Sequence, residues 1–233
     1  LVGLAGQLHG VPIVLFQSRD AVVGGVALAQ AIGRWGNYFN QEAYGLPLRE
    51  SSPLCFFPLA VLIQEGNSRN WHIATFFLES CWDFLIFWFL LWGRRNLFRR
   101  QGDVFLWYLL LYGAGRQAIE SLRLDSLYLG GQIRVSQLLS ILLVLAILLC
   151  FTRQRIKAES FSGWLSLAAG LAGITGVLLL CSCFPAIPFP FLKVFPARIL
   201  FLSCCSLILI MTAFLLYGKT PAKEVIYACH EAD

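Results

Sequence analysis

Hydrophobic residues in this chain gather in long runs, which are separated by short stretches rich in polar residues, glycine and proline. Runs of this length suffice for an α-helix to cross the hydrocarbon core of a bilayer. Residues 1–16 are expected to hold the end of a spanning helix and a turn, followed by a polar break at 17–20. The pattern then predicts spanning helices over residues 20–40, 72–92, 103–121, 135–151, 164–183 and 199–217.

One segment interrupts this series. Residues 43–71 contain several glycine, proline and asparagine residues and scattered charges, a composition typical of a loop. We expect this long loop to lie outside the hydrocarbon and to contain a short interfacial helix near 58–64. Its length indicates a role beyond connecting two helices.

Composition strengthens the membrane interpretation. Of the 233 residues, 58% are hydrophobic and 13% are charged, against roughly 25% charged residues in an average soluble domain. The net charge of +5 is spread in short clusters and not along a basic tract, which favours topology signals and anionic lipids as partners, not nucleic acid. The eight cysteines show no metal-binding spacing. The sequence therefore predicts an all-α polytopic membrane protein, a helical bundle with a polar cavity and a long extracytoplasmic loop.

Basic clusters set the expected orientation. Arg94, Arg95, Arg99 and Arg100 follow the run at 72–92, and the positive-inside rule places that end in the cytoplasm. The loop at 43–71 is then extracytoplasmic.

A polar cluster at the end of the run 20–40 is the main anomaly. Arg34, Asn37 and Gln41 fall at i, i+3 and i+7 and so share one helix face. The glycines at 33 and 36 would let a backbone or a ligand come close. We interpret this cluster as an anion-binding face at membrane depth.

A second polar series lies in the run 103–121, where Tyr112, Arg116 and Glu120 are spaced i, i+4 and i+8 and continue to Arg123. An unpaired arginine at the bilayer centre costs roughly 3 kcal/mol, so Arg116 should line a polar cavity or find a partner. Arg116 and Glu120 can simply form a structural pair, but the Arg34 face favours a functional cavity. In the run 72–92, His72, Glu79 and Asp83 are expected on one helical stripe.

These residues resemble the signature elements of the bacterial prolipoprotein diacylglyceryl transferases. The resemblance covers about residues 9–151. Its elements are the signature around Gly33, Arg34, Gly36, Asn37, Asn40 and Glu42, a histidine–glutamate element at 72–79, a second arginine motif at 112–126, and the start of a last helix at 134–137.

The chain departs from the family pattern in two elements. In the histidine–glutamate element, Ile73 and Leu78 replace the family's proline and tyrosine. The family's His-Gly-Gly element would fall ahead of Leu1, so the chain is expected to be amino-terminally truncated. Residues 1–151 would form the transferase-like membrane domain, and 152–233 an additional two-helix membrane hairpin with a cytoplasmic tail.

The resemblance implies transfer of the sn-1,2-diacylglyceryl group from phosphatidylglycerol to the lipobox cysteine of a prolipoprotein signal peptide, in the bacterial inner membrane. It implies catalytic roles for Arg34, Arg116 and Glu120, and no metal or organic cofactor. The residues that it implies in substrate binding are Arg34, Asn37, Asn40, Glu42, Tyr112, His72 and Arg123. His72 is also a substitute candidate for taking the thiol proton.

Two other interpretations stay open at this point. The two arginines can hold a phospholipid headgroup without chemistry, as in a lipid-binding or transport membrane protein. The chain can also be an inactive relative, because of its altered histidine element and the absent His-Gly-Gly element.

Overall fold

The structure, a computed structural model, describes residues 2–98, 100, 102–129, 133–158, 163–183 and 195–217. Its elements in chain order are α1 (Val2–Asn40), β1 (Pro47–Leu48), β2 (Ala60–Glu65), β3 (Ser68–Ile73), α2 (Thr75–Asn96), α3 (Asp103–Ile119), the 3₁₀ turn η1 (Glu120–Leu122), β4 (Tyr128–Leu129), β5 (Ile133–Arg134), α4 (Val135–Ala158), α5 (Gly163–Cys183) and α6 (Phe195–Tyr217).

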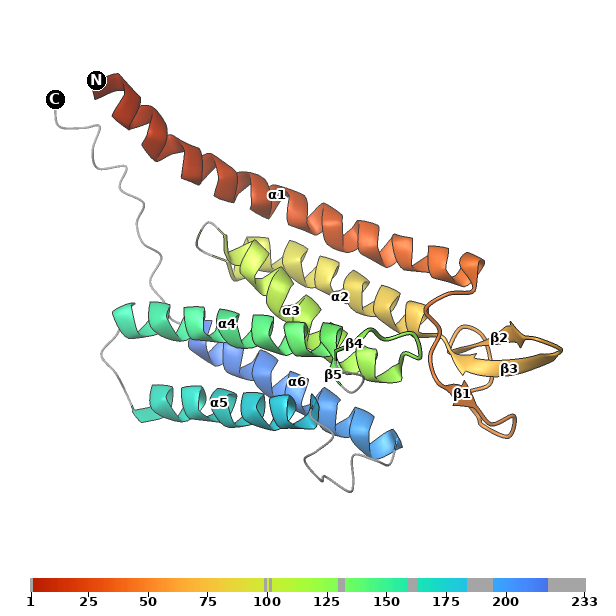
Figure 1. Cartoon of the computed structure of the whole chain (residues 1–233). Helices are drawn as coiled ribbons and strands as arrows, with labels where there is room; N and C mark the ends of the chain where they lie inside the picture. Colours follow the sequence, from red (N-terminus) through yellow and green to blue (C-terminus); the bar gives the residue numbers. More distant parts are fainter. Residues whose placement is uncertain are drawn as a thin grey trace.

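The helices form a bundle in which α3 contacts α1, α2, α4 and α6, and the small sheet lies at one end (Figure 1). One hydrophobic core extends from Val23 on α1 to Tyr217 on α6, with Trp107 of α3 fully buried inside it. Helices α2, α4, α5 and α6 are each long and apolar enough to cross a membrane. The predicted all-α polytopic membrane fold is confirmed.

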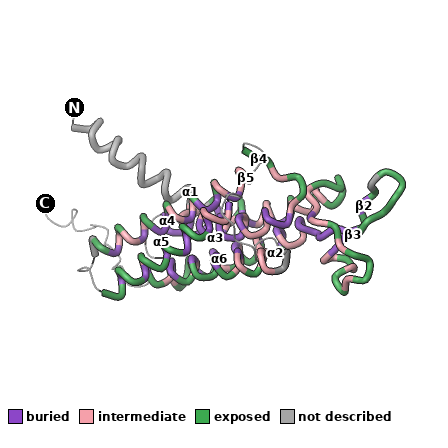
Figure 2. The backbone as a smooth tube through the Cα atoms, turned by 60° about the horizontal axis from the view of Figure 1, so that its bottom comes forward, coloured by how far each residue is buried: buried purple, intermediate pink, exposed green. Residues whose placement is uncertain are grey.

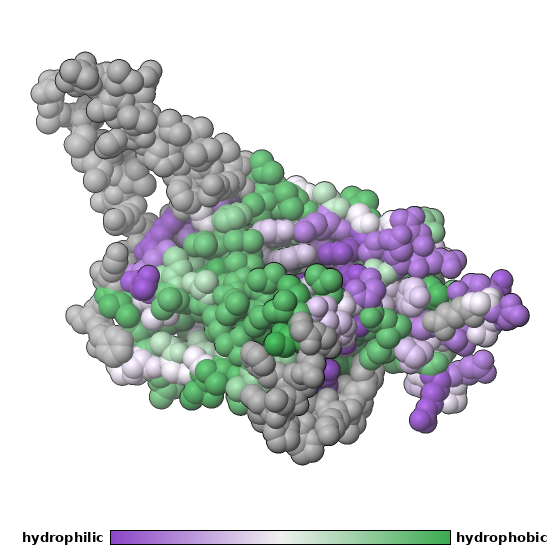
Figure 3. Space-filling view, in the orientation of Figure 1, coloured by the Kyte–Doolittle hydropathy of each residue, from purple (hydrophilic) through white to green (hydrophobic). Residues whose placement is uncertain are grey.

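Exposure and hydropathy follow this arrangement. Buried residues lie where the helices face one another, whereas the tip of the β2–β3 hairpin is exposed (Figure 2). On the face shown in Figure 3, hydrophobic residues cover the middle of the bundle, and hydrophilic residues gather at the end that carries the sheet. This distribution is the one expected for a bundle that meets lipid along its sides and water at its ends.

The segment between α1 and α2 is a folded lobe and not a loop with an interfacial helix. Strands β1, β3 and β2 form an antiparallel sheet in that order, and a tight turn with Gly66 at φ 60° joins β2 to β3. The helix predicted near 58–64 is wrong, because Ala60–Glu65 pairs residue by residue with Ser68–Ile73. His72 therefore lies in β3, and the span predicted at 72–92 runs instead from Thr75 to Asn96.

The amino-terminal segment also differs from its prediction. α1 is continuous through the predicted turn and the polar break at 17–20. Asp20, which suggested the break, accepts hydrogen bonds from the backbone N–H groups of Gly102 and Phe105 at 2.7 and 3.1 Å. These N–H groups belong to the start of α3, so Asp20 caps α3 from within α1.

The carboxyl end of α1 closes with a tight reversal that leads into the lobe. The Glu42 N–H donates to the Asn37 carbonyl at 2.9 Å, and the Gln41 N–H donates to the Tyr38 carbonyl at 3.2 Å. Gln41 has φ 54°. This pairing and the left-handed residue are the Schellman motif, which usually has glycine at the position of Gln41.

Further along the chain, α4 runs to Ala158, beyond the end predicted at 151. Arg155 is buried, and its guanidinium lies 5.3 Å from the ring centre of Trp164, so the basic end of the helix packs against the start of α5. The two helices predicted at 164–183 and 199–217 are confirmed as α5 and α6. The predicted tail after residue 217 lies outside the described residues.

Candidate functional site

Three arginines from separate parts of the fold converge on one carboxylate, Glu79 of α2. Arg34 Nη1 lies 3.0 Å from Glu79 Oε2, Arg116 Nη1 contacts Oε1, and Arg123 Nη1 lies 3.6 Å from Oε1. The Glu79 side chain is buried, whereas the three arginines keep 13–21% of their side-chain surface exposed. We call these four residues the arginine cluster.

Short contacts between helices position the cluster. On the α1 side, Trp35 Nε1 donates to Ser80 Oγ at 3.1 Å, and Ser80 Oγ donates to the Ala31 carbonyl at 2.7 Å. On the α3 side, Trp82 Nε1 donates to the Leu111 carbonyl at 3.0 Å. The Trp82 ring fits because position 115 is glycine: a Cβ there would lie 2.0 Å from Trp82 Nε1.

Further carboxylates surround the cluster. Asp83 Oδ2 lies 3.8 Å from Arg34 Nε, and Glu120 Oε2 lies 2.7 Å from Arg116 Nη2. Arg123 binds Asp125 with two hydrogen bonds of 3.0 and 2.8 Å. These hydrogen bonds hold the pKa of Asp125 below its ordinary value and raise the pKa of Arg123. With all groups ionised, four carboxylates more than balance the three guanidinium charges.

The arginine cluster encloses little free space. A cavity of about 10 Å³ lies among side chains of α1, α2 and α3, namely Arg34, Glu79, Trp82, Asp83, Tyr112, Arg116 and Ile119. This volume is roughly enough for one water molecule. A larger anion therefore has to bind outside this cavity, at the exposed part of the arginine side chains. A guanidinium has five N–H donors, and Arg34 directs only Nη1 and Nε at carboxylates among the described residues.

Most of the predicted site residues meet here. Arg34, Arg116, Glu120 and Arg123 share ion pairs around Glu79. Tyr112 lines the small cavity and stacks on Tyr108. Arg116 and Glu120 do not form an isolated structural pair, because Arg116 also pairs with Glu79.

The remaining predicted residues lie elsewhere. Asn37 is half-buried near the end of α1, and Asn40 and Glu42 are exposed there. Among the described residues, Arg34 pairs with Glu79 and Asp83 and not with Glu42. His72 is buried in β3, where Nδ1 donates to the Gly45 carbonyl at 2.9 Å and the ring lies edge-on to Tyr44. The helical stripe predicted for His72, Glu79 and Asp83 is therefore wrong for His72.

Sequence reasoning missed the central role of Glu79 and the contribution of Asp83. The signal was present, because two carboxylates spaced i, i+4 within a helix apolar enough to cross a membrane require cationic partners there. No described backbone approaches Gly33 or Gly36, because a Cβ at either position would meet no described atom within 4 Å; the expected approach of a ligand stays a prediction.

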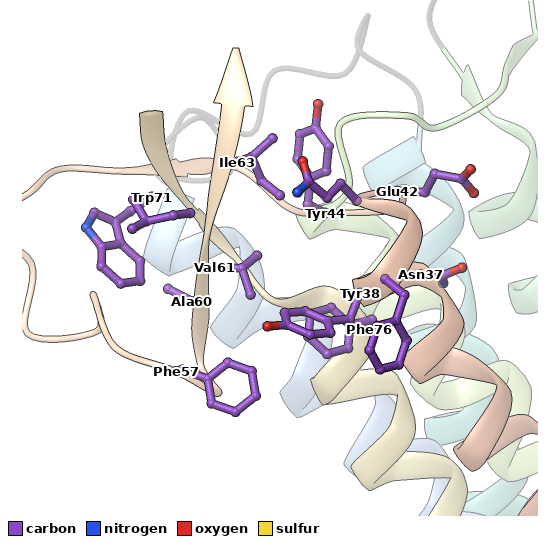
Figure 4. A pocket seen from close by; sticks show the side chains of 13 residues that line it. Asn37, Tyr38, Glu42, Tyr44, Phe57, Ala60, Val61, Ile63, Trp71 and Phe76 are labelled. Atoms are coloured by element: carbon purple, nitrogen blue, oxygen red, sulfur yellow. The ribbon is translucent and has the colours of Figure 1, made fainter. Parts of the chain in front are cut away.

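Two larger cavities lie beside the lobe. One of about 440 Å³ lies between the end of α1 and strand β2 (Figure 4). The other, of about 560 Å³, is lined by Gln41, Glu42, Ala43, Tyr44, Leu124 and Asp125. Among the described residues, no group of three or more histidine, cysteine or acidic side chains is placed to hold a metal ion.

Fold and site together define a polytopic helical membrane protein with a buried arginine–carboxylate cluster near the end that carries the sheet. A family model for prolipoprotein diacylglyceryl transferase matches residues 4–153. The chain belongs to this family, as the resemblance in its sequence predicts.

Relatives agree with this assignment. The chain is 44% identical over 144 residues to the phosphatidylglycerol–prolipoprotein diacylglyceryl transferase of Streptococcus equi subsp. equi, a match that covers 61% of this chain and 54% of the relative. It is 44% identical over 139 residues to the enzyme of that name from Geobacillus kaustophilus, covering 58% and 50%. The chain thus spans about half the length of the curated relatives it matches. No solved structure matches it.

Proposed function

We propose that this protein transfers the sn-1,2-diacylglyceryl group of phosphatidylglycerol to the lipobox cysteine of a prolipoprotein signal peptide, forming a thioether. The observation that carries the proposal is the convergence of Arg34, Arg116 and Arg123 on Glu79, in a chain of the transferase family. Arginine side chains that keep part of their surface exposed are suited to a phosphodiester, which a guanidinium can bind through paired hydrogen bonds.

The reaction needs two kinds of assistance. The cysteine sulfur attacks carbon C3 of the diacylglycerol, the C3–oxygen bond breaks, and glycerol phosphate leaves with an additional negative charge. Cations close to the phosphate lower the barrier because they stabilise this developing charge. A base must also accept the thiol proton.

The residues of the cluster suit the first task. Arg34, the most exposed of the three arginines, would bind the phosphodiester of the donor. Arg116 would stabilise the departing phosphate while Glu120 and Glu79 hold its guanidinium in place. Arg123 and Tyr112 would complete the donor site. In this proposal Glu79 is a positioning residue, because it acts through the arginines.

The polar residues at the end of α1 suit the donor headgroup. Asn37, Asn40 and Glu42 would bind its glycerol hydroxyls or the non-bridging phosphate oxygens. His72 stays a candidate for accepting the thiol proton, although its ring is buried in β3 and donates from Nδ1 to the Gly45 carbonyl.

We also propose which membrane holds the protein and how its chain is divided. The bacterial inner membrane would supply phosphatidylglycerol and the precursor, and the lobe would lie on its outer side. Residues 1–151 would form the transferase-like unit, to which residues 152–233 add a membrane hairpin and a cytoplasmic tail.

Transfer to a thiol distinguishes this function from lipid binding alone. The full chain in phosphatidylglycerol-containing vesicles is incubated with a lipobox peptide and, separately, with the same peptide carrying serine for cysteine. Mass spectrometry should show a diacylglyceryl adduct on the cysteine peptide only. Phosphatidylglycerol binding without an adduct on either peptide would contradict the proposal and support the lipid-binding alternative.

A further inference from the structure

The proposed function leaves one substrate without a place in the structure. The arginine cluster accounts for the phosphate of the donor, but its cavity of about 10 Å³ cannot admit a peptide. The peptide cysteine must nevertheless reach this region. The cavity of about 440 Å³ between α1 and β2 has a size typical of ligand sites, which run roughly from 300 to 1,000 Å³.

This cavity follows the free edge of β2. Successive residues of a strand point to opposite faces, yet all four residues from Ala60 to Ile63 line the cavity. In Figure 4, Val61 and Ile63 point from β2 toward Tyr38 and Tyr44, whereas Ala60 lies on the other side, near Trp71. A single cavity meets both faces of a strand only where it passes along the strand's edge. β2 is an edge strand, since the order of the sheet is β1, β3, β2.

The backbone along this edge is available for pairing. In the antiparallel β2–β3 hairpin the residue pairs alternate between hydrogen-bonded and non-hydrogen-bonded, beginning with the bonded pair Glu65–Ser68 next to the two-residue turn. Leu62 and Gln64 therefore belong to the non-bonded pairs, and their backbone N–H and C=O groups point away from β3. Ala60, the other residue of this set, already donates its N–H to the Phe56 carbonyl at 2.9 Å.

The groove continues toward the arginine cluster. Gln41, Glu42 and Tyr44 line both the groove and the cavity of about 560 Å³, which ends at Leu124 and Asp125. Asp125 binds Arg123, and Arg123 lies 3.6 Å from Glu79. A chain lying along β2 can therefore extend past Glu42 as far as Asp125, the ion-pair partner of Arg123.

We propose that the groove between β2 and the end of α1 binds the peptide substrate as an extended strand that pairs with the edge of β2. This inference rests on the proposed function and assigns its peptide subsite. Backbone pairing favours a peptide over a lipid acyl chain, because an acyl chain cannot bond the outward N–H and C=O groups of Leu62, which lines the groove. Alternate side chains of the peptide would contact the exposed aromatic side chains of Tyr38 and Phe57, which line the groove.

Methylation of the peptide backbone tests this pairing. The probe is a fluorescently labelled peptide of small apolar residues in which serine replaces the single cysteine, so that binding is measured without transfer. Each backbone nitrogen in turn is methylated. Since a docked strand directs every second N–H at its partner, methylation should weaken binding to the full chain in phosphatidylglycerol nanodiscs by about tenfold at alternate positions. A flat profile would overturn the inference.

A variant pair tests the protein side. Leu62→Pro removes the outward N–H of Leu62 but no hydrogen bond of the β2–β3 pairing, and should weaken peptide binding by about tenfold. Leu62→Ala keeps the N–H and controls for the lost side chain, so its effect should be several-fold smaller. Thermal stability and phosphatidylglycerol binding should be the same in both variants. Equal peptide affinity in the two variants would contradict the pairing.

These binding measurements separate the two proposals. If methylation weakens binding at alternate positions but no lipid is transferred to a cysteine peptide, the peptide groove is supported and the proposed enzyme function is contradicted. If lipid is transferred to a cysteine peptide but the methylation profile is flat, the enzyme function is supported and the peptide groove is contradicted. A groove that holds an acyl chain would show the flat profile.

Discussion

The helices of this protein are held together in two different ways. Around Glu79, helices α1, α2 and the end of α3 are joined by ion pairs between buried carboxylates and half-buried arginines. The α5–α6 hairpin packs on α3 and α4 mainly with apolar and small side chains, and α5 carries no charged residue. Its polar connections to α3 are hydrogen bonds. Gln117 Nε2 donates to Ser206 Oγ and, at 3.2 Å, to the Leu202 carbonyl, and Ser206 Oγ donates to the Ala114 carbonyl at 3.0 Å. The Tyr217 hydroxyl at the end of α6 also donates to Asp103 Oδ2 of α3.

We expect the charged region around Glu79 to take part in the chemistry and the α5–α6 hairpin to contribute packing. Apolar helices in a membrane associate through close packing of small residues and a few hydrogen bonds, without any need for charge. Charged groups at membrane depth are costly, so we expect the three arginines and their buried carboxylate partners to serve a function. Removing charge should therefore disable transfer, whereas weakening the contacts of the hairpin should mainly lower stability.

The largest effect is expected from Glu79→Gln. The substitution keeps the shape of the side chain but removes the charge shared by three arginines, so that transfer should fall by about 10²–10³-fold and the free energy of unfolding by about 3 kcal/mol. Transfer assays and thermal unfolding in detergent measure the two effects. Glu50→Gln, at an exposed position in the lobe, is the matched control and should change stability by less than about 0.5 kcal/mol. Wild-type transfer by Glu79→Gln would show that the cluster is not needed.

Replacing a glycine by alanine in each region tests how closely the helices pack there. Gly115→Ala places a Cβ against the Trp82 ring and should separate α2 from α3, with a loss of about 1–3 kcal/mol in stability and roughly tenfold in transfer. Gly173→Ala in α5 meets nothing within 4 Å and should stabilise its helix by up to about 1 kcal/mol. Equal effects of the two substitutions would refute the claimed close fit at Gly115.

A smaller effect is expected where α6 meets α3. Ser206→Ala removes a hydroxyl that binds both Gln117 and Ala114, and should cost about 1 kcal/mol while changing transfer no more than a few-fold. The double variant Gln117→Leu with Ser206→Ala should recover part of this loss, because no buried amide then lacks its partner. Ser203→Ala, on a partly exposed face of α6, is the control. A loss of transfer as large as that of Glu79→Gln would place the hairpin in the catalytic machinery.

The sequence predicted the contacts that are local in the chain. The i, i+4 spacing of Arg116 and Glu120 is enough to predict their ion pair, and the apolar runs predict α5 and α6. The pairing of Arg34 with Glu79 depends on how α1 and α2 pack, through Trp35 and Ser80, and no spacing along the chain encodes it.

The missed elements have a similar cause. The apolar stretch in β2 is short, and short apolar runs fit a strand or a helix equally well; its pairing with Ser68–Ile73 decides the matter. Asp20 looked like the end of a helix because its partners, the N–H groups at the start of α3, lie more than 80 residues away. A polar residue inside a membrane helix indicates a break only when no other element forms hydrogen bonds with it.

Transfer by Arg34→Ala is the most direct measurement of whether the cluster holds the donor phosphate. The rate of diacylglyceryl transfer from phosphatidylglycerol vesicles to a cysteine peptide is compared for the wild-type chain, Arg34→Ala, and Arg49→Ala, which changes an exposed arginine of the lobe. Arg34→Ala should lose at least about 10²-fold in rate, with Arg49→Ala close to wild type. Wild-type transfer by Arg34→Ala would contradict the assignment of the arginine cluster as the donor site.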